Sequence, residues 1–92
     1  MSLSKNWDLQ VDPDVYKFLK RVPRREAEVI LNIIRLLSAD PYFGDIQRMR
    51  GAINIWRRRV GNHRIFYKID TEKKVILVFR LERRTSKTYR KR

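Results

Sequence analysis

Two residues, Gly61 and Asn62, separate two segments that are rich in strand-forming residues. The first segment runs from 53 to 60 and the second from 63 to 70. Glycine and asparagine tolerate the positive φ angles that a two-residue hairpin turn needs. The sequence therefore predicts an antiparallel hairpin, and so short a turn also fixes which residues lie opposite one another.

The predicted register sorts the side chains of the hairpin onto two faces, because successive residues of a strand point to opposite sides of a sheet. Val60 is expected opposite His63, and Arg59 opposite Arg64. The face expected to form the core beneath the helices carries Trp56, Val60, Ile65, Tyr67 and Ile69. The other face carries Arg57, Arg59, Arg64, Phe66 and Lys68. Arg58 falls on the core face, so we expect it to reach solvent at an edge or to pair with an acidic group.

The rest of the chain supplies two helices and two further strands. Residues 6–11 alternate polar and apolar side chains, as a half-buried strand does. Asp12 caps a helix that has Pro13 at its first position and ends near Pro23. The elements expected after it are a helix from 23 to 39, a loop from 40 to 51 and, beyond the hairpin, a strand from 75 to 82.

This order of elements predicts an α+β fold. We expect a helical hairpin packed on one face of a mainly antiparallel four-stranded sheet, in the order strand-helix-helix-strand-strand-strand. The chain has 92 residues, which suits a single domain over 1–92 with one small core. A basic tail begins at about residue 83. The direction in which the first strand pairs stays open.

The formal net charge of +13 is unevenly distributed. Residues 1–47 hold seven basic and seven acidic side chains, which cancel, whereas residues 48–92 hold sixteen basic and three acidic ones. A fold gains nothing from such self-repulsion, so the asymmetry indicates a surface that binds a polyanion. The alternative is a solvated basic surface that aids solubility.

Composition excludes several other classes of function. Without cysteine the chain has neither disulfides nor thiolate metal sites, and the cytoplasm is the expected compartment. No apolar stretch fits a membrane span or a signal peptide. His63 is the only histidine, and beside a turn we expect it to be a surface or turn residue and not a catalyst or ligand. We therefore expect no metal and no cofactor.

The pairing of Arg59 with Arg64 points to a ligand. Like charges directly opposite one another destabilise a sheet, and a bound phosphate would compensate them because guanidinium groups match its oxygens. Arg57 lies on the same face, and Phe66 offers a ring on which a base can stack. The residues expected to bind single-stranded nucleic acid are Arg57, Arg59, Arg64, Phe66 and Lys68. The alternative is an exposed sheet face that carries soluble arginines.

The order of the elements and three stretches of sequence resemble the RelE-type toxins of the RelE/ParE superfamily. The stretches are Met49-Arg50-Gly51, the run from Trp56 to Tyr67 with the pattern W-R-x-R-V-G-x-x-R-I-x-Y, and the ending from Arg83 to Tyr89. The resemblance covers nearly the whole chain. It implies a toxin that cuts messenger RNA in the ribosomal decoding site without a metal, and an acidic RelB-like antitoxin as its partner.

The resemblance also assigns roles to residues. Arg57 and Arg59 match the two basic strand residues that hold the scissile phosphate, and Arg64 matches the arginine of the next strand. Arg83 matches the arginine after the last strand, and Tyr89 the C-terminal tyrosine. The implied catalytic residues are Arg59, Arg64, Arg83 and Tyr89.

The residues suit RNA cleavage, which requires a base for the 2′-hydroxyl and positive charge to neutralise the phosphorane. The arginines can supply the charge, and the cations around Tyr89 favour tyrosinate as the base. Where relatives often have lysine the chain has arginine, which is a poor proton donor because it stays charged. Two alternatives remain: a ParE-like inhibitor of DNA gyrase, and a non-catalytic module that binds RNA or ribosomes, for which Tyr89 would be a tail residue without a partner.

Overall fold

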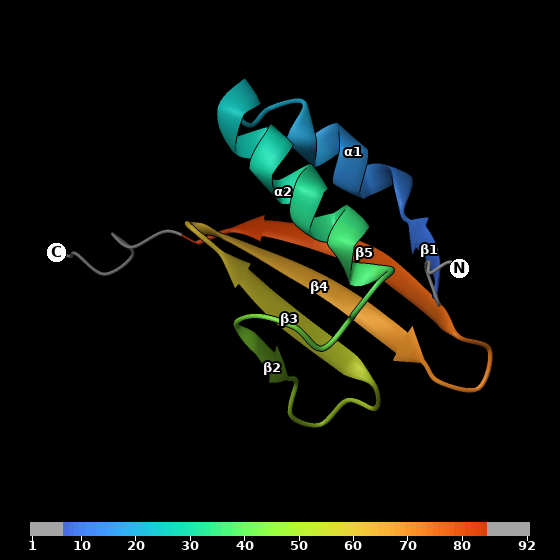
Figure 1. The fold of residues 1–92 in the computed structure, drawn as a ribbon. Coiled ribbons are helices and arrows are strands. Elements are labelled where there is room, and N and C mark those ends of the chain that lie inside the picture. Colours follow the sequence, from blue (N-terminus) through green and yellow to red (C-terminus); the bar gives the residue numbers. More distant parts are fainter. Residues whose placement is uncertain (1–6, 85–92) are drawn as a thin grey trace, which may run out of the picture.

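The computed structural model describes residues 7–84, and its helices and strands follow the predicted order (Figure 1). They are β1 (Asp8–Val11), α1 (Pro13–Leu19), α2 (Arg24–Leu37), β2 (Ile46–Arg48), β3 (Ile55–Val60), β4 (His63–Asp70) and β5 (Val75–Arg83). The predicted α+β class is confirmed. The expected count of four strands is wrong, because the segment predicted as a loop contains β2 and the sheet has five strands.

The short strand β2 is defined by its pairing with β3 and not by a pattern in its own sequence. Three residues are too few to show a strand period, and the surrounding glycines and proline favour a loop. Pairing with β3 nevertheless aligns Ile46 with Arg58 and Gln47 with Arg57. This contact brings the segment after α2 alongside the residues of the predicted RNA-binding face.

The sheet has the order β1-β5-β4-β3-β2. Strand β1 runs parallel to β5, while the other neighbouring pairs are antiparallel. The direction of the first strand, which the sequence left open, is therefore decided by a partner from the other end of the described chain.

The hairpin of β3 and β4 has the predicted register. Val60 pairs with His63 and Arg59 with Arg64, and the alignment continues to the far end of β3. Gly61 has a φ of +58°, the positive angle that the turn requires. The two faces of the hairpin are therefore those that the sequence predicts.

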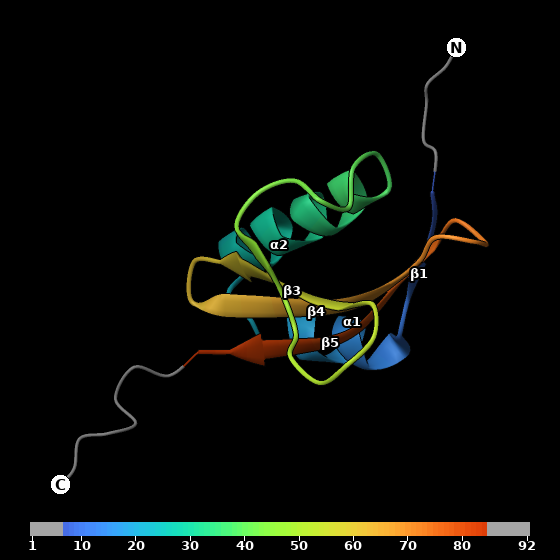
Figure 2. The same cartoon turned by 90° about the horizontal axis from the view of Figure 1, so that it is seen from below.

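The core lies between the two helices and strands β4 and β5. In Figure 2, α2 lies along one side of β3 and β4, and α1 lies beside β5. Asp12 starts α1 as predicted, because its Oδ1 accepts a hydrogen bond of 2.9 Å from the Asp14 N–H. The buried apolar side chains are Val15, Leu19, Ile30, Ile34, Leu37, Ile65, Tyr67, Ile69, Ile76, Val78 and Leu81. Trp56 and Val60 are partly buried against this core.

Candidate nucleic-acid interface

The side of β3 and β4 that faces away from the core, here called the basic face, carries the five residues predicted to bind RNA. Arg57 is aligned with Phe66, and Arg59 with Arg64, on neighbouring strands. Directly opposite residues in a sheet have Cβ atoms about 5 Å apart, so these four side chains share one patch. Lys68 lies farther along β4, aligned with Ile55.

Asp45, which precedes β2, and Gln47, which lies within it, each contact an arginine of the basic face. The Arg59 Nε lies 3.1 Å from Asp45 Oδ2 in an ion pair, and the Arg57 guanidinium donates a hydrogen bond to the side-chain oxygen of Gln47. A bound phosphate is expected to compensate the opposed arginines, and the structure adds a carboxylate of the chain itself beside Arg59. No sequence pattern indicates this contact, since Asp45 lies in the segment predicted as a loop.

Strand β5 adds charged residues that the sequence reasoning missed. Glu82 is aligned with Arg64, and Arg80 with Phe66. Arg80 Nη2 also lies 2.5 Å from Glu82 Oε2. A bulge shifts the register between Phe66 and Tyr67, so that β5 residues on either side of it keep their apolar side chains on the core face. Val78 and Leu81 are both buried although they are three residues apart, whereas residues on one face of a regular strand are an even number apart. This odd spacing of apolar residues is the feature of the sequence that indicates the bulge.

A cavity of about 280 Å³ lies near the other end of the sheet, beside Lys68. Its lining residues come from β1, β4, β5 and the turn after β4: Gln10, Lys68, Asp70, Lys73, Val75 and Leu77. Lys68 therefore belongs to a region separate from the arginine patch, about four residues or 13 Å along β4 from Arg64.

The other two predicted catalytic residues do not join the patch in the described part of the chain. Arg83 is exposed and aligned with His63, whose side chain points to the core side of the sheet. By alternation Arg83 leaves β5 on the side opposite Arg59 and Arg64. Tyr89 lies outside the described residues.

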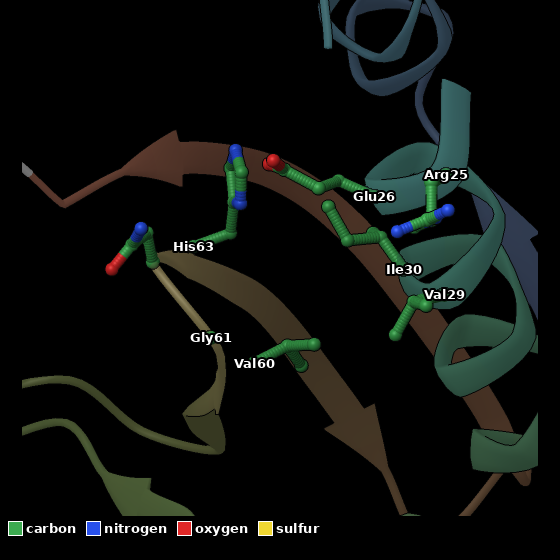
Figure 3. Close-up of a pocket in the computed structure, with 8 residues that line it drawn as sticks. Arg25, Glu26, Val29, Ile30, Val60, Gly61 and His63 are labelled. Atoms are coloured by element: carbon green, nitrogen blue, oxygen red, sulfur yellow. The ribbon is translucent and has the colours of Figure 1, made fainter. Parts of the chain in front are cut away.

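His63 directly follows the turn, as expected, but it is buried, so exposure at the surface is the part of the expectation that is wrong. Its side chain is 3% exposed, and the edge of its ring packs against Phe18. Figure 3 shows it pointing toward Glu26 at the border of a cavity of about 270 Å³ between α2 and the β3–β4 turn. Burial lowers the pKa of the imidazole below 6.5; Glu26 opposes this shift and Arg83 adds to it. A neutral histidine packed beneath a helix has a structural role.

Arg58 finds an unexpected partner on the core side of β3. Its guanidinium lies 4.3 Å from the centre of the Phe43 ring, and its Nη1 donates a hydrogen bond of 3.0 Å to the Phe43 carbonyl oxygen. The expectation of an acidic partner is therefore wrong, because a ring and a carbonyl stabilise the charge. This contact ties the segment after α2 to the sheet.

Within residues 7–84, neither helix has the length and apolar character of a membrane span. The same part of the chain holds no group of three or more histidine, aspartate or glutamate side chains arranged to bind a metal ion. The basic face carries the guanidinium groups of Arg57, Arg59 and Arg64, which can bind phosphates and neutralise charge.

Comparison with known proteins identifies the family. The model of the ParE toxins of type II toxin-antitoxin systems (parDE) matches residues 6–87. The chain belongs to this family. It is therefore a type II toxin of the RelE/ParE superfamily.

Solved structures of related toxins share the fold. A chain of the archaeal RelE-RelB complex from Pyrococcus horikoshii has a TM-score of 0.75 at 23% identity, and the match covers 85% of this chain and 94% of that one. A chain of the RelB-RelE antitoxin-toxin complex from Methanococcus jannaschii has a TM-score of 0.69 at 25% identity, with 90% and 99% covered.

The YoeB/ParE toxin from Agrobacterium tumefaciens has a TM-score of 0.68 at 24% identity, with 85% of this chain and 99% of that chain covered. No curated protein matched the sequence. The structural relatives include chains of complexes between RelE toxins and RelB antitoxins.

Proposed function

We propose that this toxin is a ribosome-dependent, metal-independent endoribonuclease that cuts messenger RNA in the cytoplasm and so inhibits translation. The observation that carries the proposal is the patch formed by Arg57, Arg59, Arg64 and Phe66 on one face of the β3–β4 hairpin. Guanidinium groups beside an aromatic ring suit a single-stranded phosphate backbone with stackable bases.

The proposed chemistry divides among four residues. Arg59 and Arg64 bind the scissile phosphate and neutralise the charge that develops on its oxygens. Tyr89 accepts the proton of the attacking 2′-hydroxyl. Arg83 contributes positive charge from the end of β5, where it is aligned with His63 and leaves the strand on the opposite side of the sheet from Arg59 and Arg64.

The proposed partners are the ribosome with its messenger RNA, and an acidic RelB-like antitoxin. The concentration of the net charge of +13 in the second half of the chain favours polyanions and acidic segments. Phe66 and Lys68 extend the proposed RNA contact along β4 beyond the scissile phosphate.

A second candidate function is inhibition of DNA gyrase. It is favoured by the description of the matching family, which is that of ParE toxins. A non-catalytic module that binds RNA or ribosomes would need the arginine patch but no Tyr89. Cleavage of a translated message separates the three functions, because only the endoribonuclease cuts RNA.

The decisive experiment incubates the toxin with ribosomes translating a defined message and maps new 5′ ends by primer extension. Wild type should cut the message, while Arg59→Gln and Arg64→Gln should lose most of the activity. Arg21→Gln is a matched control, since it removes the same charge from an exposed site between the helices. Tyr89→Phe should bind ribosomes as before and cut at least about tenfold more slowly, a loss of about 1.4 kcal/mol.

A wild-type toxin that cuts no message but blocks DNA supercoiling by gyrase would contradict the endoribonuclease proposal and support the second candidate. Ribosome binding without cleavage and without gyrase inhibition would instead support the non-catalytic module.

A further inference from the structure

We propose that Asp45 is an internal competitor for RNA: its carboxylate holds Arg59 in the free toxin and is displaced when a phosphate of the RNA backbone binds. This inference rests on the RNA-binding role proposed above. It adds a residue from outside the hairpin that sets the affinity of the basic face.

The geometry of the ion pair makes Asp45 a substitute for a phosphate. Arg59 Nε and Asp45 Oδ2 are 3.1 Å apart, on the face where Arg59 is aligned with Arg64. Carboxylates and phosphates bind the same N–H groups of a guanidinium. A phosphate oxygen that uses the Arg59 Nε therefore has to take the place of Asp45 Oδ2.

The ion pair is exposed enough to be exchanged. The Arg59 side chain is 47% exposed and that of Asp45 63% exposed. Exposed ion pairs of this kind are weak, since water and salt screen them. A phosphate arriving from solvent can therefore replace the carboxylate without unpacking the core.

The backbone keeps Asp45 in place while its side chain exchanges. The Arg59 N–H donates to the Asp45 carbonyl oxygen at 3.0 Å, and the Ile46 N–H donates to the Gly44 carbonyl oxygen at 3.0 Å. The displaced carboxylate thus stays close to Arg59 and competes at a high effective concentration. Gln47, two residues after Asp45, accepts a hydrogen bond from the Arg57 guanidinium, but its amide oxygen carries no charge.

Asp45 competes with RNA for Arg59 and not for Arg64. Among residues 7–84, Arg64 forms no ion pair, and Glu82, aligned with it, lies 2.5 Å from Arg80 Nη2. Arg64 is therefore the guanidinium available to a first phosphate contact. Arg59 is the one whose contact with RNA requires the exchange with Asp45.

The test measures binding of a single-stranded 20-nucleotide uridine RNA to Asp45→Asn across a salt series. We expect binding about two- to fivefold tighter than in wild type, the range that corresponds to loss of one exposed ion pair. The log-log salt slope should steepen by up to about 0.7, because one more phosphate is neutralised without uncovering a carboxylate.

The matched control is Glu72→Gln, which removes the same charge from the exposed turn between β4 and β5. It lies about 25 Å along the strand from the arginine patch, well beyond the screening length at physiological salt, so the affinity and slope should stay at wild-type values. Thermal melting of both variants checks that each is folded.

A double-mutant cycle with Arg59→Gln identifies the group through which Asp45 acts. The gain from Asp45→Asn should disappear in the Arg59→Gln background. Equal affinities for Asp45→Asn and Glu72→Gln would overturn the proposal, and so would a gain that persists without Arg59. Loss of cleavage in Asp45→Asn with unchanged RNA binding would also overturn it, since Asp45 would then act in the chemistry.

Failure of the broader RNA-binding role gives a different pattern. In that case the wild type and Arg59→Gln would bind the RNA equally weakly, and neither would respond to salt. If the wild type depends on Arg59 and on salt while Asp45→Asn matches its control, only the competition by Asp45 is wrong.

Discussion

Burial favours the neutral forms of two ionisable side chains, His63 and Tyr67. Burial lowers the pKa of the imidazole and raises the pKa of Tyr67 to about 12. The protonated Tyr67 hydroxyl donates a hydrogen bond of 2.8 Å to the Pro41 carbonyl oxygen. His63 thus connects β4 to Phe18 of α1, and Tyr67 connects β4 to Pro41 after α2. The stability of the fold should therefore depend on the protonation of His63 and on the hydroxyl of Tyr67.

We expect the stability to fall as the pH is lowered through the unfolded-state pKa of His63, which is near 6.5. The unfolded chain binds the proton more readily than the folded one, so the free energy of unfolding decreases from there down to the lower folded pKa. The charged groups that act on the imidazole are Glu26 and Arg83.

Melting temperatures at about pH 7.5 and about pH 5.5 test this dependence. His63→Gln should lose less stability between the two values than wild type, because the carboxylates that also titrate are common to both. Parallel curves for the two proteins would show that the histidine is as easily protonated in the folded state as in the unfolded one.

Tyr67→Phe should lower the free energy of unfolding by about 1 kcal/mol, since it leaves the carbonyl of the buried Pro41 without its donor. Urea titration measures the loss. Tyr42→Phe serves as the control, because that ring is 47% exposed. A change below about 0.3 kcal/mol in Tyr67→Phe would mean that another donor replaces the hydroxyl.

At the scale of elements, the segment between α2 and β3 organises one side of the basic face. Arg58 binds the Phe43 carbonyl and ring, and the next residues lead directly into Asp45 and β2. Gly44 makes this possible, because it has a φ of +86° and a Cβ at this position would collide with the Arg58 guanidinium. The side chain of a core-facing arginine thus positions the carboxylate that contacts Arg59.

Gly44→Ala should therefore destabilise the toxin more than Gly51→Ala. Both glycines have positive φ, so both substitutions carry a backbone cost of about 1–2 kcal/mol, but a Cβ at Gly51 meets no atom within 4 Å. The difference between the two free energies of unfolding isolates the collision with Arg58. Equal losses would show that the guanidinium moves aside without cost.

At the scale of the whole molecule, the net positive charge lies in the second half of the chain, and the sheet brings part of it onto one face. The acidic residues of the first half balance its basic ones, while β3 and β4 present Arg57, Arg59 and Arg64 on one face. Two acidic residues moderate this charge: Asp45, which precedes β2, pairs with Arg59, and Glu82 of β5 pairs with Arg80. The fold therefore tolerates the concentration of positive charge.

RNA binding by the whole toxin should weaken steeply with salt. If Arg57 and Arg64 each neutralise one phosphate of a single strand, and Arg59 does so in exchange for Asp45, the log-log slope lies between about −1.4 and about −2, since each full contact contributes about −0.7. Arg57→Gln should reduce the magnitude of the slope by about 0.7. Filter binding over a range of salt concentrations provides the measurement, and an affinity that hardly changes between low and moderate salt would refute the electrostatic role of the face.

The sequence by itself determined the hairpin and its two faces. The Gly61-Asn62 turn set the register, and the side-chain period of two then placed Arg59 opposite Arg64 and Tyr67 in the core. These features depend on neighbouring residues of the chain, which is why they could be predicted. The motif of the hairpin likewise led to the superfamily that the family match supports.

Only the tertiary structure decided what surrounds that hairpin. The pairing of β2 with β3 and of β1 with β5 joins segments whose contacts leave no local pattern. Asp45 therefore emerged as the partner of Arg59, and Phe43 as that of Arg58, only in the folded chain. His63 was misplaced for the same reason, because α1 and α2 bury a residue beside a turn that the sequence alone would leave exposed. Local periodicity orients side chains, but packing between distant segments decides which charges meet and which groups lose contact with water.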